Sequence, residues 1–369
     1  MRSLSLDGLA VRGMRNLVAV DLELCRRFNV ISGDNGQGKT NLLEAIYVLA
    51  TSKSFRAVTP GALVRHGGEI ASVRAVLAEG TDERREQSVG LKHGARLVRI
   101  DGKRPPTLAA YAVRTPVVVF HPGAVALSAG GGSERRRLLD RIALYRAPSS
   151  LASAESYTRA LRERQRSLET RGVGARDLDQ WEELLAQHGL ALSSARGAAA
   201  ALLLDSAMRA FERIGTPHTA LRAIYARSAP EDAAAYRSEL AQRRASDMRR
   251  GSATMGPHRD DIGLFLDDHA VRGVASQGQH RAVVLALKLA EIDVIGAARA
   301  VQPILLLDDV SSELDRDRTA ALFAFLQERR GQVFLTTSRP DLIDTGPLTG
   351  DALRQDFDVE SGVVRLLSV

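Results

Sequence analysis

The sequence predicts an α/β protein in which a mixed sheet, beginning with antiparallel strands, is interrupted by an inserted helical lobe. Alternating strand patterns fill residues 4–31, helical periodicity dominates from about residue 133 to residue 250, and buried strand patterns return afterwards. At 369 residues, 44% apolar and 26% charged, the chain has an ordinary globular composition and is long enough for two domains. We expect one head formed by residues 1–122 and 251–369, with residues 123–250 inserted as the lobe.

In the first part of the head, strand patterns flank one helix. Residues 4–31 give three strands, of which the last is the buried run 28–31, and residues 41–50 give the helix. Further strands are expected at residues 71–77, 87–91, 96–100 and 117–120. In the lobe, helices are expected from residue 133 onward, including residues 151–170, 198–211 and 230–248.

The second part of the head is expected to contain a strand at residues 262–266, an apolar helix over residues 282–295, a buried strand at 304–307 and a helix reaching about residue 329. A buried strand at residues 332–338 follows, and a strand pair around residues 361–362 ends the pattern. The order strand, helix, strand over residues 304–338 predicts a parallel βαβ unit.

The clearest motif lies between the strand at 28–31 and the helix beginning at Asn41. It reads Gly33-Asp34-Asn35-Gly36-Gln37-Gly38-Lys39-Thr40 and fits G-x-x-x-x-G-K-[ST] in full. Such a loop points backbone N–H groups at phosphate oxygens, while Lys39 reaches the β- and γ-phosphates and Thr40 holds Mg²⁺. Only five of the 51 basic residues are lysines, so the composition of the chain does not by itself explain a lysine at this position. The alternative is a glycine-rich turn with a solvated lysine, which leaves the strand, loop and helix context unexplained.

Two later segments complement this loop. Ser276 is placed as the N-cap of a long apolar helix and is followed by Gln277, Gly278 and Gln279; by itself this is only a capped helix. The buried run 304–307 ends in Asp308 and Asp309. Carboxylates at the end of a buried strand are the other half of a phosphate-loop site, where one of them holds the water shell of Mg²⁺.

Charge favours an anionic partner. The net charge is +7 and the isoelectric point is near 9.9, which is typical of proteins that bind nucleic acid or an acidic surface, although a basic solvated surface is the alternative. Cys25 is the only cysteine, so no intrachain disulfide is possible, and a reducing cytoplasm is expected. No apolar run approaches the roughly 18–20 residues that span a bilayer, and Asp7 is an acid too early for a secretory signal.

With these motifs in view, nearly the whole chain resembles the RecF family, bacterial recombination-mediator ATPases whose heads are similar to those of SMC and ABC ATPases. The matching motifs in order are Walker A (33–40), the signature (276–279), Walker B (304–309) and the D-loop Ser312-Glu313-Leu314-Asp315. The segments 120–122, 135–140, 256–261 and 275–281 match this family in particular. The fold class implied is an ABC/SMC-type P-loop ATPase head.

The resemblance implies a site shared between two protomers. ATP and Mg²⁺ would be bound by residues Gly33 to Asn41 of one protomer and capped by the signature residues of the other, so ATP should drive homodimerisation. Mg²⁺ would be held by Thr40 and Asp308. Asp309 stands where the wider superfamily commonly has the glutamate that polarises water, with Glu313 as the reserve base.

Two positions depart from the superfamily pattern. A Q-loop glutamine is not evident, because the segment entering the lobe reads Phe120-His121-Pro122-Gly123. Thr336 and Thr337 occupy the place of the switch histidine.

The function implied is that of a cytoplasmic, DNA-dependent ATPase of recombinational DNA repair. It would bind DNA, including single- and double-stranded junctions, without strong sequence preference and help to load recombinase with RecO and RecR. One alternative is the ATPase subunit of a membrane transporter, which shares the three motifs but usually lacks segment 256–261. The other is a nucleotide-gated DNA-binding switch with little turnover, which Asp309 makes plausible.

Overall fold

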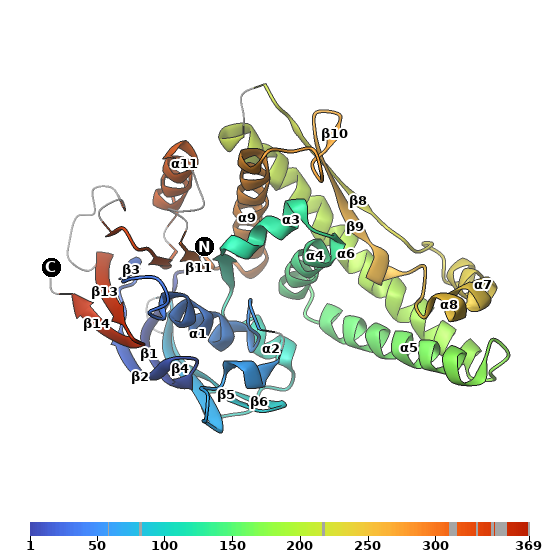
Figure 1. Cartoon of the computed structure of the whole chain (residues 1–369), viewed down its shortest axis with the longest axis horizontal. Coiled ribbons are helices and arrows are strands. Elements are labelled where there is room, and N and C mark those ends of the chain that lie inside the picture. Colours follow the sequence, from blue (N-terminus) through green and yellow to red (C-terminus); the bar gives the residue numbers. More distant parts are fainter. Residues whose placement is uncertain are drawn as a thin grey trace. The chain divides into compact units, whose positions relative to one another are not determined.

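The computed structural model describes residues 1–57, 59–80, 83–215, 218–309, 316–329, 331–340, 343 and 353–367. The chain divides into two compact units, residues 1–124 with 295–369, and residues 125–294 (Figure 1). Residues 251–294, which the sequence pattern assigned to the head, therefore belong to the same compact unit as the helical lobe. The reason is strand pairing, because residues 261–266 pair with a strand at 221–226.

The first unit contains an antiparallel sheet among its described residues. Its strands, in spatial order, are β2 (Leu17–Glu23), β1 (Leu4–Met14), β4 (Ile70–Glu79), β5 (Glu83–Lys92) and β6 (Ala95–Ile100). Alternate residues such as Leu9 and Val11 are buried while their neighbours face outward, which is the pattern of a sheet with one covered face. The three predicted strands at 71–77, 87–91 and 96–100 are confirmed.

A second sheet of this unit carries the buried strands. Its described strands are, in spatial order, β14 (Val363–Leu367), β13 (Arg354–Glu360), β3 (Phe28–Ser32), β12 (Val333–Thr336), β11 (Ile304–Asp308) and β7 (Val117–Phe120). All neighbours pair in parallel except β13 with β14, which pair antiparallel. Parallel strands covered on both faces explain the fully apolar runs in the sequence.

Helices of the first unit connect and cover these strands. The described helices include α1 (Lys39–Thr51), which contacts strands of both sheets, α2 (Leu108–Ala112) and α11 (Arg316–Gln327), with a 3-10 turn at Pro60–Leu63. Because α11 lies in sequence between the parallel neighbours β11 and β12, the predicted βαβ unit is confirmed. The predicted mixed sheet with antiparallel N-terminal strands is confirmed as well, distributed over two sheets.

The second unit is mainly helical. Its described helices are α3 (Ala126–Ala129), α4 (Gly132–Arg146), α5 (Ser150–Arg171), α6 (Leu178–Ile214), α7 (Ala233–Gln242), α8 (Arg244–Arg250) and α9 (Gln277–Arg299), the last of which continues past the end of the unit at residue 294. A small antiparallel sheet joins β8 (Leu221–Ala226), β9 (Asp261–Leu266) and β10 (His269–Ala270).

Two expectations for the lobe were wrong. Strand β8 lies where helical periodicity was expected, because Leu221 pairs opposite Leu266 and only this partner, 45 residues away, makes an extended conformation favourable. The helix predicted over residues 230–248 is two helices, α7 and α8, which meet at Arg243.

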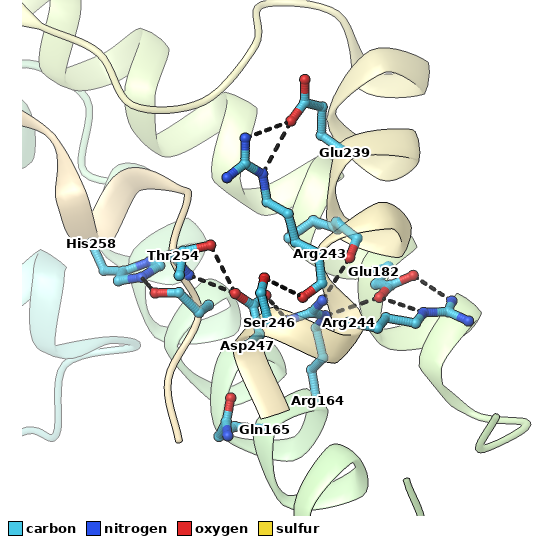
Figure 2. Close-up of polar contacts among 12 residues, drawn as sticks. Arg164, Gln165, Glu182, Glu239, Arg243, Arg244, Ser246, Asp247, Thr254 and His258 are labelled. Atoms are coloured by element: carbon cyan, nitrogen blue, oxygen red, sulfur yellow. Dashed lines mark hydrogen bonds and ion pairs between the residues drawn. The ribbon is translucent and has the colours of Figure 1, made fainter. Parts of the chain in front are cut away.

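Buried charges hold the helices of the second unit together (Figure 2). Arg164 of α5 is fully buried and donates to Glu182 of α6 at 3.0 Å, to Asp247 of α8 at 2.8 Å and to the Leu240 carbonyl of α7 at 2.7 Å. Asp247 also accepts hydrogen bonds from the backbone and hydroxyl of Thr254. Four helices of the second unit thus meet at one guanidinium, and a fifth segment, at Thr254, bonds to one of its carboxylate partners.

The segments 135–140 and 256–261, which carry much of the family resemblance, contribute to ion pairs in this unit. Arg135 donates from Nε to Asp261 at 2.6 Å, and Arg196 of α6 donates to Asp140 at 2.6 Å. Asp260 is fully buried and accepts hydrogen bonds from the Tyr225 hydroxyl at 2.6 Å and from other donors. These contacts give the two segments a structural role.

Candidate nucleotide-binding site

The phosphate loop lies between β3 and α1, as the motif predicts. Gly33 has φ +137°, and a Cβ there would lie 2.4 Å from the Val359 carbonyl oxygen of β13, so no other residue fits without displacing that strand. Helix α1 begins at Lys39, and no side chain caps its first N–H groups. Those donors, with the positive end of the helix dipole behind them, suit a phosphate.

Lys39 is buried and folds back over the loop. Its Nζ donates to the carbonyl oxygens of Gly33 at 2.5 Å and Asp34 at 2.9 Å. The ammonium is therefore held at the loop by two backbone acceptors, and a bound phosphate would offer it stronger, charged acceptors. Residues 34–36 are exposed, so a ligand can approach this side of the loop.

The structure brings together the two residues proposed to hold Mg²⁺. The Thr40 hydroxyl donates to Asp308 Oδ1 at 2.8 Å, although the two residues are 268 positions apart in the chain. A hydroxyl and a carboxylate are hard oxygen ligands of the kind Mg²⁺ prefers, so this pair fits the ion. Among the residues that the structure describes, no group of three or more His, Cys, Asp or Glu side chains could hold a metal.

Asp308 is buried at the end of β11, and its pKa is set by opposing influences. Burial raises the pKa of its carboxyl, while hydrogen bonds from Thr40 and Thr336 and the charge of Arg56 lower it. The net direction is upward, and a cation beside the carboxylate would favour the ionised form that the site requires.

Thr336, on the neighbouring strand β12, bonds to the Asp308 carboxylate and to the backbone of Asp309. Its hydroxyl donates to Asp308 Oδ1 at 2.9 Å and accepts from the Asp309 backbone N–H at 3.0 Å. Asp309 itself adopts a left-handed backbone conformation with φ +51°, at the point where the chain leaves β11. Of the two threonines at the switch position, Thr336 contacts Walker B, and the Thr337 N–H donates to the Ile31 carbonyl.

Some predicted site residues are not described or belong to the other unit. Glu313 and the D-loop 312–315 lie outside the described residues. Ser276 belongs to the second unit, and its Oγ accepts from the Gln279 N–H at 3.2 Å while the Gln279 side chain accepts from the Ser276 N–H at 2.8 Å. This reciprocal pair is a capping box at the start of α9, and it confirms the predicted N-cap.

Sequence reasoning missed residues beside the loop. Asn16, in the turn between β1 and β2, donates to the Gln37 carbonyl at 2.8 Å and accepts from the Asn41 side chain at 2.8 Å. Arg56 donates to Asn41 Oδ1 at 3.2 Å. The sequence carries no signal for these contacts, because Asn16 reads as an ordinary turn residue.

Comparison with known proteins identifies the family. The family described as RecF/RecN/SMC N terminal domain matches residues 5–354. The chain belongs to this family. A relative named DNA replication and repair protein RecF, from Myxococcus xanthus (strain DK1622), is 40% identical, with 96% of each chain covered. Another relative of the same name, from Anaeromyxobacter sp. (strain Fw109-5), is 39% identical. The aligned region covers 98% of this chain and 99% of the relative.

Solved structures agree with this family assignment. A structure of the recombination mediator protein RecF-ATP in the RecFOR pathway has a TM-score of 0.87 at 28% identity and covers 99% of this chain and 98% of its own. An Smc head domain from Pyrococcus furiosus has a TM-score of 0.55 at 14% identity, which shows the fold alone. The predicted ABC/SMC-type head is therefore confirmed. No helix within the described residues is long and apolar enough to cross a membrane.

Proposed function

We propose that this RecF-family protein is a recombination-mediator ATPase of DNA replication and repair that acts as an ATP-driven dimer in the cytoplasm. The observation that carries the proposal is the contact of the Thr40 hydroxyl with Asp308, which joins Walker A to Walker B beneath the loop that bears Lys39. Relatives named as RecF over nearly their full length support the biological role, and their names argue against a transporter subunit.

In the proposed reaction, the chain's own groups bind and orient the triphosphate. The first N–H groups of α1 and the Lys39 ammonium bind the phosphates. Thr40 and Asp308 would hold Mg²⁺, which would supply positive charge beside the phosphate oxygens. Asp309 accepts a proton from the attacking water, and Thr336 fixes the backbone that carries this carboxylate. Asp309→Asn should bind ATP, stop turnover and accumulate as dimer; a variant that still hydrolyses ATP would transfer the role of base to Glu313.

We infer that the site is completed by a second copy of the chain. Ser276 is exposed and begins α9, so its helix N-terminus can meet the γ-phosphate, which ADP lacks. Light scattering with ATP should show a dimer for the wild type and a monomer with ADP. Lys39→Met should lose ATP binding, and Ser276→Arg should bind ATP as a monomer.

A matched control distinguishes an effect of altering the signature motif from a general effect of adding an arginine. Ser238→Arg adds the same side chain at an exposed position of α7 in the same unit and should dimerise normally with ATP. If Ser276→Arg also dimerises with ATP, the proposed arrangement in trans is wrong.

DNA and partner proteins complete the proposal. The net charge of +7 supports binding to DNA, including single- and double-stranded junctions, and such binding should weaken steeply with salt. A binding constant that does not change between low and high salt would refute this. RecO and RecR are proposed as partners because the similar solved structures are named for the RecFOR pathway.

Turnover measured with and without DNA separates two versions of the function. A slow, DNA-stimulated ATPase should hydrolyse ATP faster when duplex DNA is added. A nucleotide-gated switch would show the same negligible turnover in both conditions while its DNA affinity still depended on ATP.

A further inference from the structure

Two turns from opposite ends of the first unit's sequence form hydrogen bonds with Gln37, in the middle of the phosphate loop. The turn between β1 and β2 supplies Asn16, whose Nδ2 donates to the Gln37 carbonyl oxygen at 2.8 Å. The turn between β13 and β14 supplies the Gly362 N–H, which donates to the same oxygen at 2.9 Å, and the Ser361 N–H, which donates to Gln37 Oε1 at 2.7 Å. One loop residue thus accepts three hydrogen bonds from outside the loop.

These contacts determine the direction of a donor that faces the other way. A trans peptide is planar, and its C=O and N–H point in opposite directions. Holding the Gln37 oxygen between Asn16 and Gly362 therefore fixes the direction of the Gly38 N–H, which belongs to the same peptide unit. In a phosphate loop the affinity for the anion depends on such N–H groups keeping their direction before the ligand arrives.

The two turns also lie close to each other. Gly362 has φ +82°, and a Cβ there would lie 2.2 Å from the Asn16 carbonyl oxygen. On its other side, the Asn16 side chain accepts a hydrogen bond from Asn41 in the first turn of α1. The loop, the start of α1 and both turns therefore form one connected set of hydrogen bonds.

We propose that Asn16 and the turn Ser361–Gly362 are positioning elements that hold the phosphate loop in its binding conformation before nucleotide arrives. The inference rests on the proposed function, since it concerns the affinity for ATP and ADP. It assigns a role in nucleotide binding to the hairpin β13–β14, which lies more than 300 residues after the loop in the sequence. None of these residues has to touch the reacting phosphate.

The test compares two glycine substitutions that have the same backbone cost. Gly362→Ala places a methyl group against Asn16, whereas Gly94→Ala lies in the turn between β5 and β6 with a similar φ of +78° and no atom within 4 Å of the new Cβ. Asn16→Ala, as a second variant, removes the side-chain donor without new bulk. Each protein is measured for ADP affinity by calorimetry, for kcat and KM with ATP, and for thermal unfolding without nucleotide.

We expect Gly362→Ala and Asn16→Ala to bind ADP about tenfold more weakly and to raise KM by a similar factor, with kcat changed less than twofold, because loop preorganisation contributes to ground state and transition state alike. Gly94→Ala should match the wild type in ADP affinity, KM and kcat. If the altered turns only lower the unfolding temperature while the folded protein binds ADP normally, their role is structural and the inference is wrong.

Failure of the proposed function gives a different result. In that case the wild type and Lys39→Met would bind ADP and ATP equally poorly, before any turn is altered. A wild type that binds nucleotide, together with turn variants that bind as tightly, overturns the positioning role alone.

Discussion

Arg164 offers the sharpest test of how the helical unit is held together. Replacing it with methionine keeps an unbranched apolar stem but removes the guanidinium and its three donors, to Glu182, Asp247 and the Leu240 carbonyl. The arginine side chain is 1% exposed, and its two acidic partners are buried to a similar degree. In Arg164→Met the two carboxylates therefore lose their charged partner at a buried position, where an unpaired charge is costly.

The magnitude follows from what remains around the two carboxylates. Removing one partner of a buried ion pair costs about 3–5 kcal/mol, because it leaves an uncompensated charge. Here Glu182 keeps Arg244, which donates to it at 3.0 Å, and Asp247 keeps the hydroxyl and N–H of Thr254. We therefore expect the lower end, a loss of about 3 kcal/mol in the free energy of unfolding of this unit.

Hydrogen exchange of the backbone amides in α5 and α8 measures this loss locally, which suits a chain with two compact units that need not unfold together. Arg162→Met is the matched control, since Arg162 lies on the same helix and is exposed. Protection in Arg164→Met should fall by about a hundredfold relative to this control. A difference below about 1 kcal/mol would mean that the buried guanidinium contributes only its packing, and the reasoning would be refuted.

Three further outcomes are expected. Thr336→Val should lower the free energy of unfolding by about 1–2 kcal/mol and reduce kcat more than it raises KM, since the lost hydroxyl fixes Asp308 and the Asp309 backbone; steady-state kinetics equal to the wild type would contradict this. Burial lowers the pKa of His258 below its ordinary value of 6.5, so the unfolded chain takes up the proton first as the pH falls. The free energy of unfolding should therefore decrease as the pH drops through 6.5. The total decrease is about 1.4 kcal/mol for each unit by which folding lowers the pKa of His258. Thermal unfolding of His258→Gln between pH 7.5 and 5 should show a shallower loss than the wild type, and an unchanged slope would exclude His258 as the cause. Gly33→Ala, whose methyl group would collide with β13, should abolish detectable ADP binding in calorimetry, and retention of wild-type affinity would show that the strand yields.

Some of the helical unit's features had no local signal in the sequence. The strand β8 was missed because Leu221 and its neighbours become extended only when paired with β9, and the partner is distant in sequence. The same pairing places residues 251–294 in the unit of the lobe, which no composition change marks. Arg164 reads as one more charged position of an exposed helix, and only the approach of three other helices shows that it is buried.

By itself, the sequence determined the elements whose cause is local. The phosphate loop depends on glycines that tolerate unusual φ values, the apolar run 304–307 has to be a covered strand, and a carboxylate directly after that strand has to lie at its end. Together with the family motifs, these local patterns predicted that Thr40 and Asp308, which are 268 positions apart, belong to one site. Only the tertiary structure decided which residues hold the phosphate loop in place. Asn16 and Gly362 both donate to the backbone carbonyl oxygen of Gln37. Every residue has a backbone carbonyl, so the residue types in the sequence do not indicate this contact.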